Sequence, residues 1–366
     1  YGEVYCATFG AKTVEAMLRD TAERYLIGHD PFHIETLWRK VYGTGYSLRP
    51  DISLVSVLSA LEMACWDIIG KECGKPVYEL LGGQVHEKLR SYTYIYPQEG
   101  DVYPAADDTD HVYTNPTRAA ERALEYVELG FTALKFDPAG PYTVFDGGMP
   151  TGQELDRSEA FMCQLREAVG GSVDLLFGTH GQFCPAGAIR LAKRLEPYDP
   201  LWFEEPVPPE DPAQMAVVAT ATSIPVATGE RLCTKYEFAR VLEEGAAAIL
   251  QLNLGRVGGL LEAKKIAALA EVKYAQIAPH LYCGPIVGAA NIQLATCSPN
   301  FLILEGIETW GGFQAALIDR PVQWQEGYVI PSREPGLGVT LNEAVARENP
   351  WEGDALHLEM GSAPVR

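Results

Sequence analysis

Six side chains that can bind a metal or move a proton recur at near-equal intervals, each at the end of a short apolar run. Successive members lie 23 to 27 residues apart. When every strand of a repeated strand–helix series ends in a polar residue, those residues meet at one mouth of a (β/α)8 barrel. Carboxylates and imidazoles gathered there are typical of divalent-metal and acid–base chemistry. The six residues are His180, Glu204, Glu230, Asn253, His280 and Glu305.

The glutamates of the segments WFEEPV and ATGER are candidate metal ligands. Adjacent strand residues point to opposite faces, so only one of Glu204 and Glu205 can share a face with Glu230. Two carboxylates from neighbouring strands can hold a hard cation such as Mg²⁺, which keeps several of its waters. A surface salt-bridge pair is the alternative. Because Glu230 is in phase one strand later, we favour Mg²⁺ held by Glu204 and Glu230.

The two histidines of the set follow the third and seventh predicted strands, about half the barrel circumference apart. His180 and His280 can therefore face each other across a ligand, one as proton acceptor and the other as donor. A lone histidine at a strand end is more often structural, but two in register with the glutamates favour catalysis.

Lys135 and Asp137 alternate on the second predicted strand and so share a face. Lys135 is a candidate catalytic base or a hydrogen-bond donor to a substrate carboxylate, and Asp137 a candidate substrate contact. A structural ion pair between them is the alternative.

The elements that position these residues divide the chain into a barrel and a second unit. From residue 91 to about residue 319, strand and helix alternate eight times. Runs such as AILQLNL and FLILE are apolar almost throughout, as expected for parallel strands buried on both faces. Residues 1–90 do not alternate, and residues 320–366 are rich in Pro, Gly and Trp. The predicted fold class is α/β: a (β/α)8-type barrel over 91–319, with an α+β capping domain formed by 1–90 and 320–366.

Local patterns place the individual elements. Apolar residues at helical spacing predict helices in the capping region over 15–26 and 53–70. Residues 320–366 are expected to form irregular segments and short strands. The strands are predicted at 91–96, 133–137, 173–178, 201–205, 224–229, 247–253, 274–279 and 300–305. The segments between them contain good helix formers, for example at 117–129, 155–169, 186–196, 235–244 and 260–272.

Composition limits the classes of partner. The net charge is −20 and the pI about 4.8, which argues against nucleic acid and anionic membrane as partners. An anionic substrate is still compatible, because a bound metal can invert the local field. The eight cysteines are scattered without a CxxC pair, as in a reduced cytoplasmic protein. No apolar run is expected to reach the roughly 18 residues needed to span a bilayer.

Two loops are candidates for substrate selection. Residues 138–154 follow the second strand and should lie on the catalytic face, as a lid or substrate loop or as a plain surface loop. Residues 42–51 form a Gly- and Pro-containing loop. Arg49 and Tyr142 are candidate contacts to a substrate hydroxyl or carboxylate.

Several segments together resemble one family. They are ALEMACWDIIGKECGKPVYELLGG, THG, WFEEPV, ATGER, ILQLNLGRVGG, IAPHLYCGP, ILE and PGLGV. In order and spacing, the chain resembles the enolase superfamily, in the mandelate racemase and muconate lactonising enzyme group, and within it the galactonate-type sugar-acid dehydratases.

This resemblance implies a mechanism. A Mg²⁺ ion would bind the carboxylate of an aldonate or aldarate, a base would remove the α-proton, and the enediolate would be stabilised by the metal. Loss of the β-hydroxyl then gives a 2-keto-3-deoxy acid. By position, Glu204 and Glu230 match metal ligands, His280 the usual base, His180 the acid and Glu305 the eighth-strand carboxylate. Relatives commonly form homo-oligomers.

Two positions depart from the family pattern. The first metal ligand of the family is an Asp at the position of Gly178, so water, His180 or Asp137 would complete the shell, or metal affinity is low. The sixth-strand Asp is Asn253, whose amide can hold an imidazole but does not stabilise an imidazolium as a carboxylate does. This substitution makes His280 a weaker candidate for the base and favours His180 or Lys135.

Three interpretations follow. The leading one is a Mg²⁺-dependent sugar-acid dehydratase, a carbon–oxygen hydro-lyase. The second is an epimerase or cycloisomerase that uses the same enediolate. The third is a catalytically impaired sugar-acid-binding homologue, because Gly178 and Asn253 replace expected aspartates.

Overall fold

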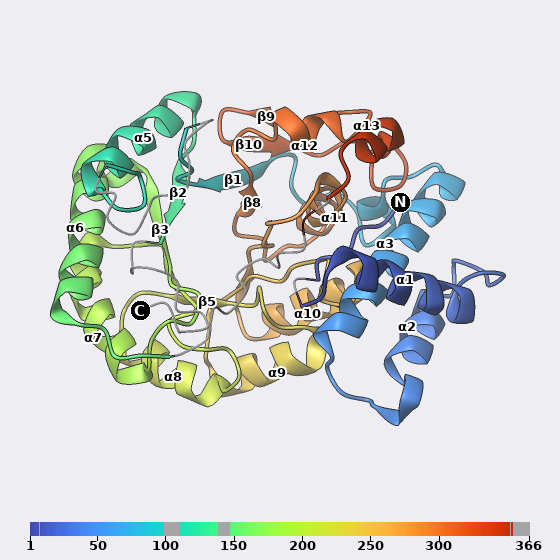
Figure 1. Ribbon diagram of the computed structural model, residues 1–366, viewed down its shortest axis with the longest axis horizontal. Helices are drawn as coiled ribbons and strands as arrows, with labels where there is room; N and C mark the ends of the chain where they lie inside the picture. Colours follow the sequence, from blue (N-terminus) through green and yellow to red (C-terminus); the bar gives the residue numbers. More distant parts are fainter. Residues whose placement is uncertain (7, 99–109, 138–146, 352, 354–366) are drawn as a thin grey trace.

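The structure is a computed structural model that describes residues 1–6, 8–98, 110–137, 147–351 and 353. Its centre is a closed barrel of eight parallel strands (Figure 1). Strands β1 to β7 pair in sequence order, and β8 pairs with β1. Between β7 and β8, Leu302 N donates to Ile277 O at 2.9 Å and closes the ring. The strands are β1 (Leu89–Tyr94), β2 (Ala133–Phe136), β3 (Asp174–Gly178), β4 (Trp202–Glu204), β5 (Val226–Thr228), β6 (Ile249–Leu250), β7 (Gln276–Ile277) and β8 (Leu304–Gly306).

The barrel interior is filled below the strand ends. One buried residue from each strand or its immediate flank contributes to a single apolar cluster, in which large and small side chains are mixed. Such a packed layer makes the interior solid, so that ligands can bind only at its mouth. The cluster consists of Tyr92, Ala133, Leu176, Trp202, Ala227, Ile249, Ala278 and Ile303.

The helices that surround the barrel begin and end where local sequence signals place them. The Asn115 side chain accepts from Thr117 N and Arg118 N at the start of α5, and Gly130, with φ of 110°, ends that helix. Thr151 and Glu154 form a capping box at the start of α6. The barrel helices are α5 (Pro116–Leu129), α6 (Gly152–Val169), α7 (Pro185–Leu195), α8 (Pro212–Ala221), α9 (Thr234–Glu244), α10 (Leu260–Val272) and α11 (Pro285–Thr296), with 3-10 turns η2 (Gly170–Ser172) and η3 (Glu196–Tyr198).

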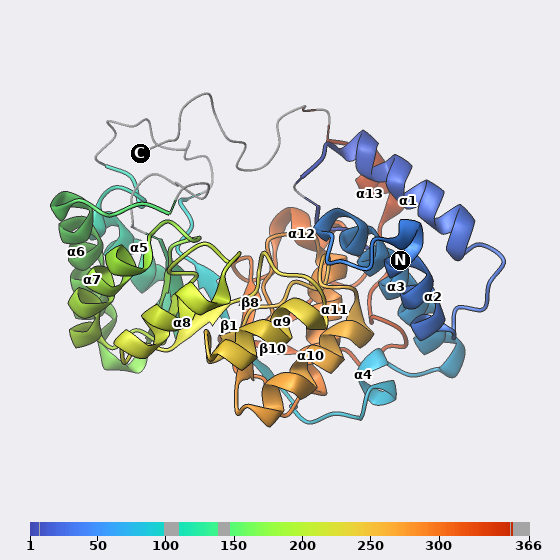
Figure 2. The ribbon, with the colours of Figure 1, turned by 90° about the horizontal axis from the view of Figure 1, so that it is seen from below.

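The N-terminal helices form a cap beside α10 and α11 (Figures 1 and 2). The cap consists of α1 (Ala11–Tyr25), α2 (Ile34–Tyr42), η1 (Thr44–Tyr46), α3 (Ile52–Cys73) and α4 (Val77–Leu80). The sequence did not predict α2, a nine-residue helix whose N-terminus no described side chain caps. Its apolar face packs on α3, and this tertiary contact stabilises a helix too short to be stable alone.

The C-terminal region contacts both the barrel and the cap. It contains α12 (Gly312–Ala316), β9 (Gln323–Gln325), β10 (Tyr328–Ile330) and α13 (Glu343–Glu348). Strand β10 pairs antiparallel with β1, and Val77 N donates to Gly336 O at 3.0 Å. The expectation of only irregular segments and short strands was wrong for α13, which the Asn342 side chain caps.

Two carboxylates of the N-terminal region cap barrel helices. Glu62 of α3 accepts from Leu260 N at 2.7 Å and Leu261 N at 2.9 Å, at the start of α10. Glu3 accepts from the first turn of α11, including Val287 N at 2.9 Å. Each carboxylate accepts from backbone N–H groups that have no partner within their own helix, so these contacts fix the cap to the barrel.

Helix α3 corrects one expectation. It is long and apolar enough, by length and composition, to cross a membrane, although no such run was expected from the sequence. Within its most apolar window, 67% is buried inside the protein. Its apolar character is therefore used in packing, as in the core helix of a folded domain.

Candidate active site

Glu204 lies at the end of β4 and points into the barrel mouth. Its Oε1 accepts from Lys135 Nζ at 2.7 Å, and its Oε2 accepts from Gln251 Nε2 at 2.7 Å. The next residue, Glu205, faces the other side and pairs with Arg231 at 2.9 Å. The alternation predicted for the two adjacent glutamates is therefore confirmed.

Gly178 is the register partner of Glu204 on the neighbouring strand. A Cβ atom at Gly178 would lie 3.2 Å from Lys135 Cε. The missing side chain thus leaves the space through which Lys135 reaches Glu204. Lys135 therefore lies beside Gly178, the position at which the family has a metal-binding Asp.

Glu230 lies between the two histidines. Its Oε2 is 3.9 Å from His180 Nε2, and its Oε1 is 3.5 Å from His280 Nε2. The Oε2 atom is buried and has no hydrogen-bond partner among the described residues. Ligand atoms of His180, Glu204 and Glu230 all lie within 4.8 Å of one another, a spacing that suits a shared cation.

His180 is held from both its ring and its backbone. Its Nδ1 is 2.7 Å from Asp137 Oδ2, and its carbonyl accepts from Arg231 Nη2 at 2.9 Å. Its backbone φ is 50°, a conformation that is uncommon for residues other than glycine. Strain of this kind persists where the surroundings fix it, and it directs the imidazole toward Glu230.

His280 has a different partner. Its Nδ1 is 2.9 Å from Asn253 Nδ2, and its Nε2 is 3.8 Å from Glu305 Oε2. Glu305 also accepts from Leu281 N at 2.8 Å and lies 3.7 Å from Lys135 Nζ. The eighth-strand carboxylate therefore joins the second histidine to the lysine.

Glu204 and Glu230 are held ionised. Burial alone would raise the pKa of Glu204, but the charges of Lys135 and His180 prevail and lower it. Burial acts in the same direction on Glu230, and the charges of His280 and His180 hold its pKa well below the usual range. Both carboxylates thus keep the charge that a cation requires.

The cationic groups are shifted in the opposite direction. Burial would lower the pKa of Lys135, but the charges of Glu204 and Glu305 raise it above the usual lysine value. Burial would likewise lower the pKa of His180, while the hydrogen bond and charge of Asp137 raise it to about 9. At neutral pH, without a metal, both side chains are therefore protonated.

The structure adds residues that the sequence did not single out. Arg256 is buried, donates to the Glu230 carbonyl at 3.2 Å, and lies 4.0 Å above the Tyr5 ring. Tyr5 in turn lies 6.0 Å from the His280 ring. Arg256 stands in NLGRVGG, part of one of the segments that carry the family resemblance. Tyr5 belongs to the N-terminal region, and no spacing rule along the barrel repeat could have found it.

Two predicted substrate contacts lie elsewhere or outside the described residues. Arg49 is exposed in the loop before α3. Tyr142 falls outside the described residues, as does most of the 138–154 loop. Asp137, the third predicted substrate contact, forms a hydrogen bond with His180.

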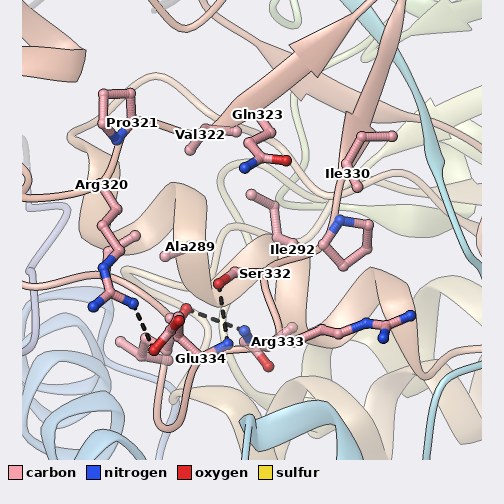
Figure 3. Close-up of a pocket in the computed structure, with 15 residues that line it drawn as sticks. Ala289, Ile292, Arg320, Pro321, Val322, Gln323, Ile330, Ser332, Arg333 and Glu334 are labelled. Carbon is pink, nitrogen blue, oxygen red and sulfur yellow. Dashed lines mark hydrogen bonds and ion pairs between the residues drawn. The ribbon is translucent and has the colours of Figure 1, made fainter.

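A cavity of about 350 Å³ lies away from this cluster, between α11 and the C-terminal region (Figure 3). Its ionised groups Arg320 and Glu334 form an ion pair, and Arg333 points away from them. None of the predicted site residues lines it. This cavity is therefore not part of the candidate site.

Comparisons with known proteins agree with this geometry. Residues 118–345 match the family described as enolase C-terminal domain-like, and residues 1–82 match the N-terminal domain of mandelate racemase and muconate lactonizing enzyme. The chain belongs to the enolase superfamily. Within this superfamily of enzymes it falls in the mandelate racemase and muconate lactonizing group, near the galactonate-type dehydratases, as the sequence predicted.

Curated relatives of this superfamily member include two sugar-acid dehydratases. A D-galactonate dehydratase of Ralstonia pickettii (strain 12J) is 37% identical over 350 residues, which are 93% of this chain and 85% of the relative. A D-gluconate dehydratase of Thermoproteus tenax is 33% identical over 366 residues, which are 100% of this chain and 69% of the relative.

Solved structures confirm the predicted α/β class and barrel. A protein of Labrenzia alexandrii DFL-11, assigned to the mandelate racemase/muconate lactonizing enzymes, is 65% identical with a TM-score of 0.94, over 98% of this chain and 90% of that one. A mandelate racemase/muconate lactonizing enzyme of a Sulfitobacter species is 51% identical with a TM-score of 0.94, over 100% and 90% of the two chains.

Proposed function

We propose that the protein is a Mg²⁺-dependent dehydratase of a sugar acid, an aldonate or aldarate, that yields a 2-keto-3-deoxy acid. The observation that carries the proposal is the position of Glu230, an ionised carboxylate with an imidazole on either side and a second carboxylate, Glu204, nearby. The named sugar-acid dehydratases among the relatives support the substrate class.

The residues present fit a divalent cation. The buried Oε2 of Glu230, which has no hydrogen-bond partner among the described residues, and the ionised Glu204 supply hard oxygen donors. Mg²⁺ commonly uses one or two carboxylates and keeps several waters. We propose Glu204 and Glu230 as the ligands. Gly178 contributes no side chain, so water or His180 completes the protein shell. When bound, the cation supplies positive charge that stabilises an enediolate.

The remaining side chains provide proton transfer and charge. His180 and His280 flank the position beside Glu230, so that each can reach a substrate carbon or oxygen there. Lys135 supplies a fixed positive charge that suits a substrate carboxylate, and Glu305 orients Lys135 and His280. These are the groups needed to remove a proton α to a carboxylate and to stabilise the charge that forms.

The direct test is incubation with D-galactonate, D-gluconate and a panel of aldarates in the presence of Mg²⁺. Product NMR and a keto-acid assay should show loss of water and a 2-keto-3-deoxy acid. A product of unchanged mass would instead identify an epimerase or cycloisomerase. Absence of both turnover and α-proton exchange in D₂O across the panel, with Mg²⁺ saturating, would exclude the proposal.

We also propose a cytoplasmic location and a homo-oligomeric assembly with no nucleic-acid or membrane partner. The acidic charge of −20 supports the absence of nucleic acid and anionic lipid as partners. The eight cysteines are free, which suits a reducing compartment. Size-exclusion chromatography with light scattering tests the assembly.

A further inference from the structure

We propose that Arg256 binds a second carboxylate of the substrate, so that the protein prefers an aldarate to the aldonate of the same configuration. This specificity rests on the proposed function and narrows its substrate class. The two curated dehydratases are named for aldonates, D-galactonate and D-gluconate, so a preference for diacids would distinguish this chain from them.

Arg256 is a buried cation that has no carboxylate partner among the described residues. It is only 6% exposed, and its Nε has no hydrogen-bond partner in that part of the chain. Its Nη1 donates to the backbone carbonyl of Glu230 at 3.2 Å, whereas the Glu230 carboxylate faces His180 and His280. A buried arginine is rarely left without an anionic partner, because desolvating a charge is costly. An anionic group of a ligand would supply that partner.

Arg256 and Lys135 come from opposite sides of the barrel mouth. Lys135 lies on β2, and Arg256 lies in the turn after β6. Because the eight strands pair in sequence order and close into a ring, β2 and β6 are half the circumference apart. Lys135 is already neutralised by Glu204 at 2.7 Å, whereas Arg256 is not. A linear acid whose first carboxylate lies on the Lys135 side would bring its far end to the Arg256 side.

The Tyr5 ring positions the guanidinium and leaves its edge free. Arg256 Cζ lies 4.0 Å from the centre of the Tyr5 ring, which therefore covers one face of the cation. The N–H groups of a guanidinium lie in its plane, so stacking does not block them, and two of them can bind one carboxylate in parallel. The Tyr5 ring also lies 6.0 Å from the His280 ring, which places the stacked pair beside the candidate catalytic residues.

Backbone contacts hold this pair in place without a ligand. Tyr5 N donates to Gly255 O at 2.9 Å, and Arg256 N donates to Asn253 O at 3.1 Å. A Cβ at Gly255 would lie 2.8 Å from Tyr5 Cβ, so the glycine allows the N-terminal segment to approach the turn closely. A donor that is fixed beforehand binds a carboxylate at a smaller entropic cost than a mobile one.

The test uses two pairs of acids that differ only at C6, D-galactonate with galactarate and D-gluconate with D-glucarate. Each aldarate carries a carboxylate where its aldonate carries a CH₂OH group. With Mg²⁺ present, the wild-type kcat/KM for the aldarate should exceed that for its aldonate by at least about tenfold in the pair that is turned over. Equal values, or a preference for the aldonate, would overturn the inference even if every variant failed to fold.

Arg256→Met removes the charge and keeps much of the side-chain length. The ratio of the two kcat/KM values should fall by about 10- to 100-fold, chiefly through KM for the aldarate, because a charge-assisted hydrogen bond is lost. Arg240→Met, at an exposed arginine, is the matched control and should keep the ratio. If Arg256 only joins the N-terminal segment to the barrel, Arg256→Met should impair both acids equally and keep the ratio, and this result would overturn the inference.

Two substitutions of Tyr5 test the stacking. Tyr5→Leu should lower the preference for the aldarate more than Tyr5→Phe does, because only phenylalanine keeps a ring under the guanidinium. Equal losses of preference in the two variants would contradict a positioning role for the Tyr5 ring. Thermal melts of all variants separate these effects from unfolding.

Failure of this inference can be distinguished from failure of the proposed function. Dehydration of aldonates without a preference for aldarates overturns the second carboxylate and leaves the dehydratase proposal standing. If the wild type turns over no acid of the panel, the dehydratase proposal fails, and the same four acids become inert ligands for calorimetry. Their Kd values should then show the preference for aldarates and its loss in Arg256→Met. Equal Kd values within each pair, or no binding of any of the four, would overturn the inference.

Discussion

Two histidines at one barrel mouth have partners of opposite chemistry. His180 is backed by the carboxylate of Asp137, whereas His280 is backed by the amide of Asn253. Both direct Nε2 toward Glu230. The comparison shows that two imidazoles at equivalent strand ends can have different partners at Nδ1, and such a partner orients the ring and tunes its basicity.

The largest change should follow from removing the group common to both histidines. Glu230→Gln takes away the carboxylate between them, so Mg²⁺ affinity should fall by more than about 100-fold. Turnover should fall by on the order of 10³-fold. Calorimetric titration with Mg²⁺ and steady-state kinetics measure these losses.

Glu210→Gln is the matched control, because Glu210 is an exposed glutamate. Its metal affinity and kinetics should equal those of the wild type. If Glu230→Gln binds Mg²⁺ as tightly as that control does, Glu230 is not a ligand.

The next substitution gives His180 an amide partner, the kind of partner that His280 has. Asp137→Asn leaves an amide behind His180, and turnover should fall by roughly 10²- to 10⁴-fold. In the metal-free protein the pKa of His180 should fall from about 9, because the hydrogen bond and charge of Asp137 raise it. NMR titration of His180 in both proteins checks the direction.

The same substitution makes a prediction about stability and pH. The folded-state pKa of His180, about 9, lies above the usual histidine value of 6.5. Its protonated pair therefore stabilises the metal-free protein fully below pH 6.5, and this stabilisation is lost as the pH rises through 9. The stability difference between the wild type and Asp137→Asn, from urea melts, should shrink over that interval. Asp156→Asn, at an exposed aspartate, is the control. The stability difference between the wild type and this variant should not change between the two pH values.

A smaller effect is expected from returning a carboxylate to the third strand. Gly178→Asp places an acid beside Glu204 and should tighten Mg²⁺ binding by roughly 10-fold. The new Cβ must displace Lys135 Cε slightly, since the two would be 3.2 Å apart. Gly178→Asn adds nearly the same volume without charge. Equal tightening in both variants would show that charge is not the cause.

The smallest effect concerns the backbone that presents His180. Arg231→Lys keeps a cation near Glu205 but loses the guanidinium geometry that reaches both Glu205 and the His180 carbonyl. Loss of one such hydrogen bond corresponds to roughly 1 kcal/mol, or about fivefold in turnover. Arg240→Lys, at an exposed arginine, should leave the kinetics unchanged, and an equal loss there would refute a specific role for Arg231.

Much of the fold could be predicted from the sequence, because its signals are local and repeat. Alternating apolar runs and helical stretches predicted the eight strand–helix units. Helix α6 begins at Gly152, before the predicted start at 155, because Thr151 and Glu154 form a capping box. Helix α2 was missed because its stability comes from packing on α3, which no local pattern records. The observed strands are also shorter than the apolar runs, since hydrogen-bonded pairing ends before apolar character does.

The candidate site was predictable only where chemistry follows the barrel repeat. Spacing brought Glu204, Glu230, His180 and His280 to one mouth, and strand alternation separated Glu204 from Glu205. It could not show that Asp137 would pair with His180 rather than face a substrate, because that depends on the strained backbone after β3. Nor could it orient the amide of Asn253, which a backbone N–H two residues later decides.

The two carboxylates that cap α10 and α11 bear on how substrate reaches the barrel mouth. Lifting the cap away would break the buried hydrogen bonds that Glu3 and Glu62 accept from the first turns of α10 and α11. Because this separation is unfavourable, we expect substrate and product to pass between the loops around the rim while both units stay docked.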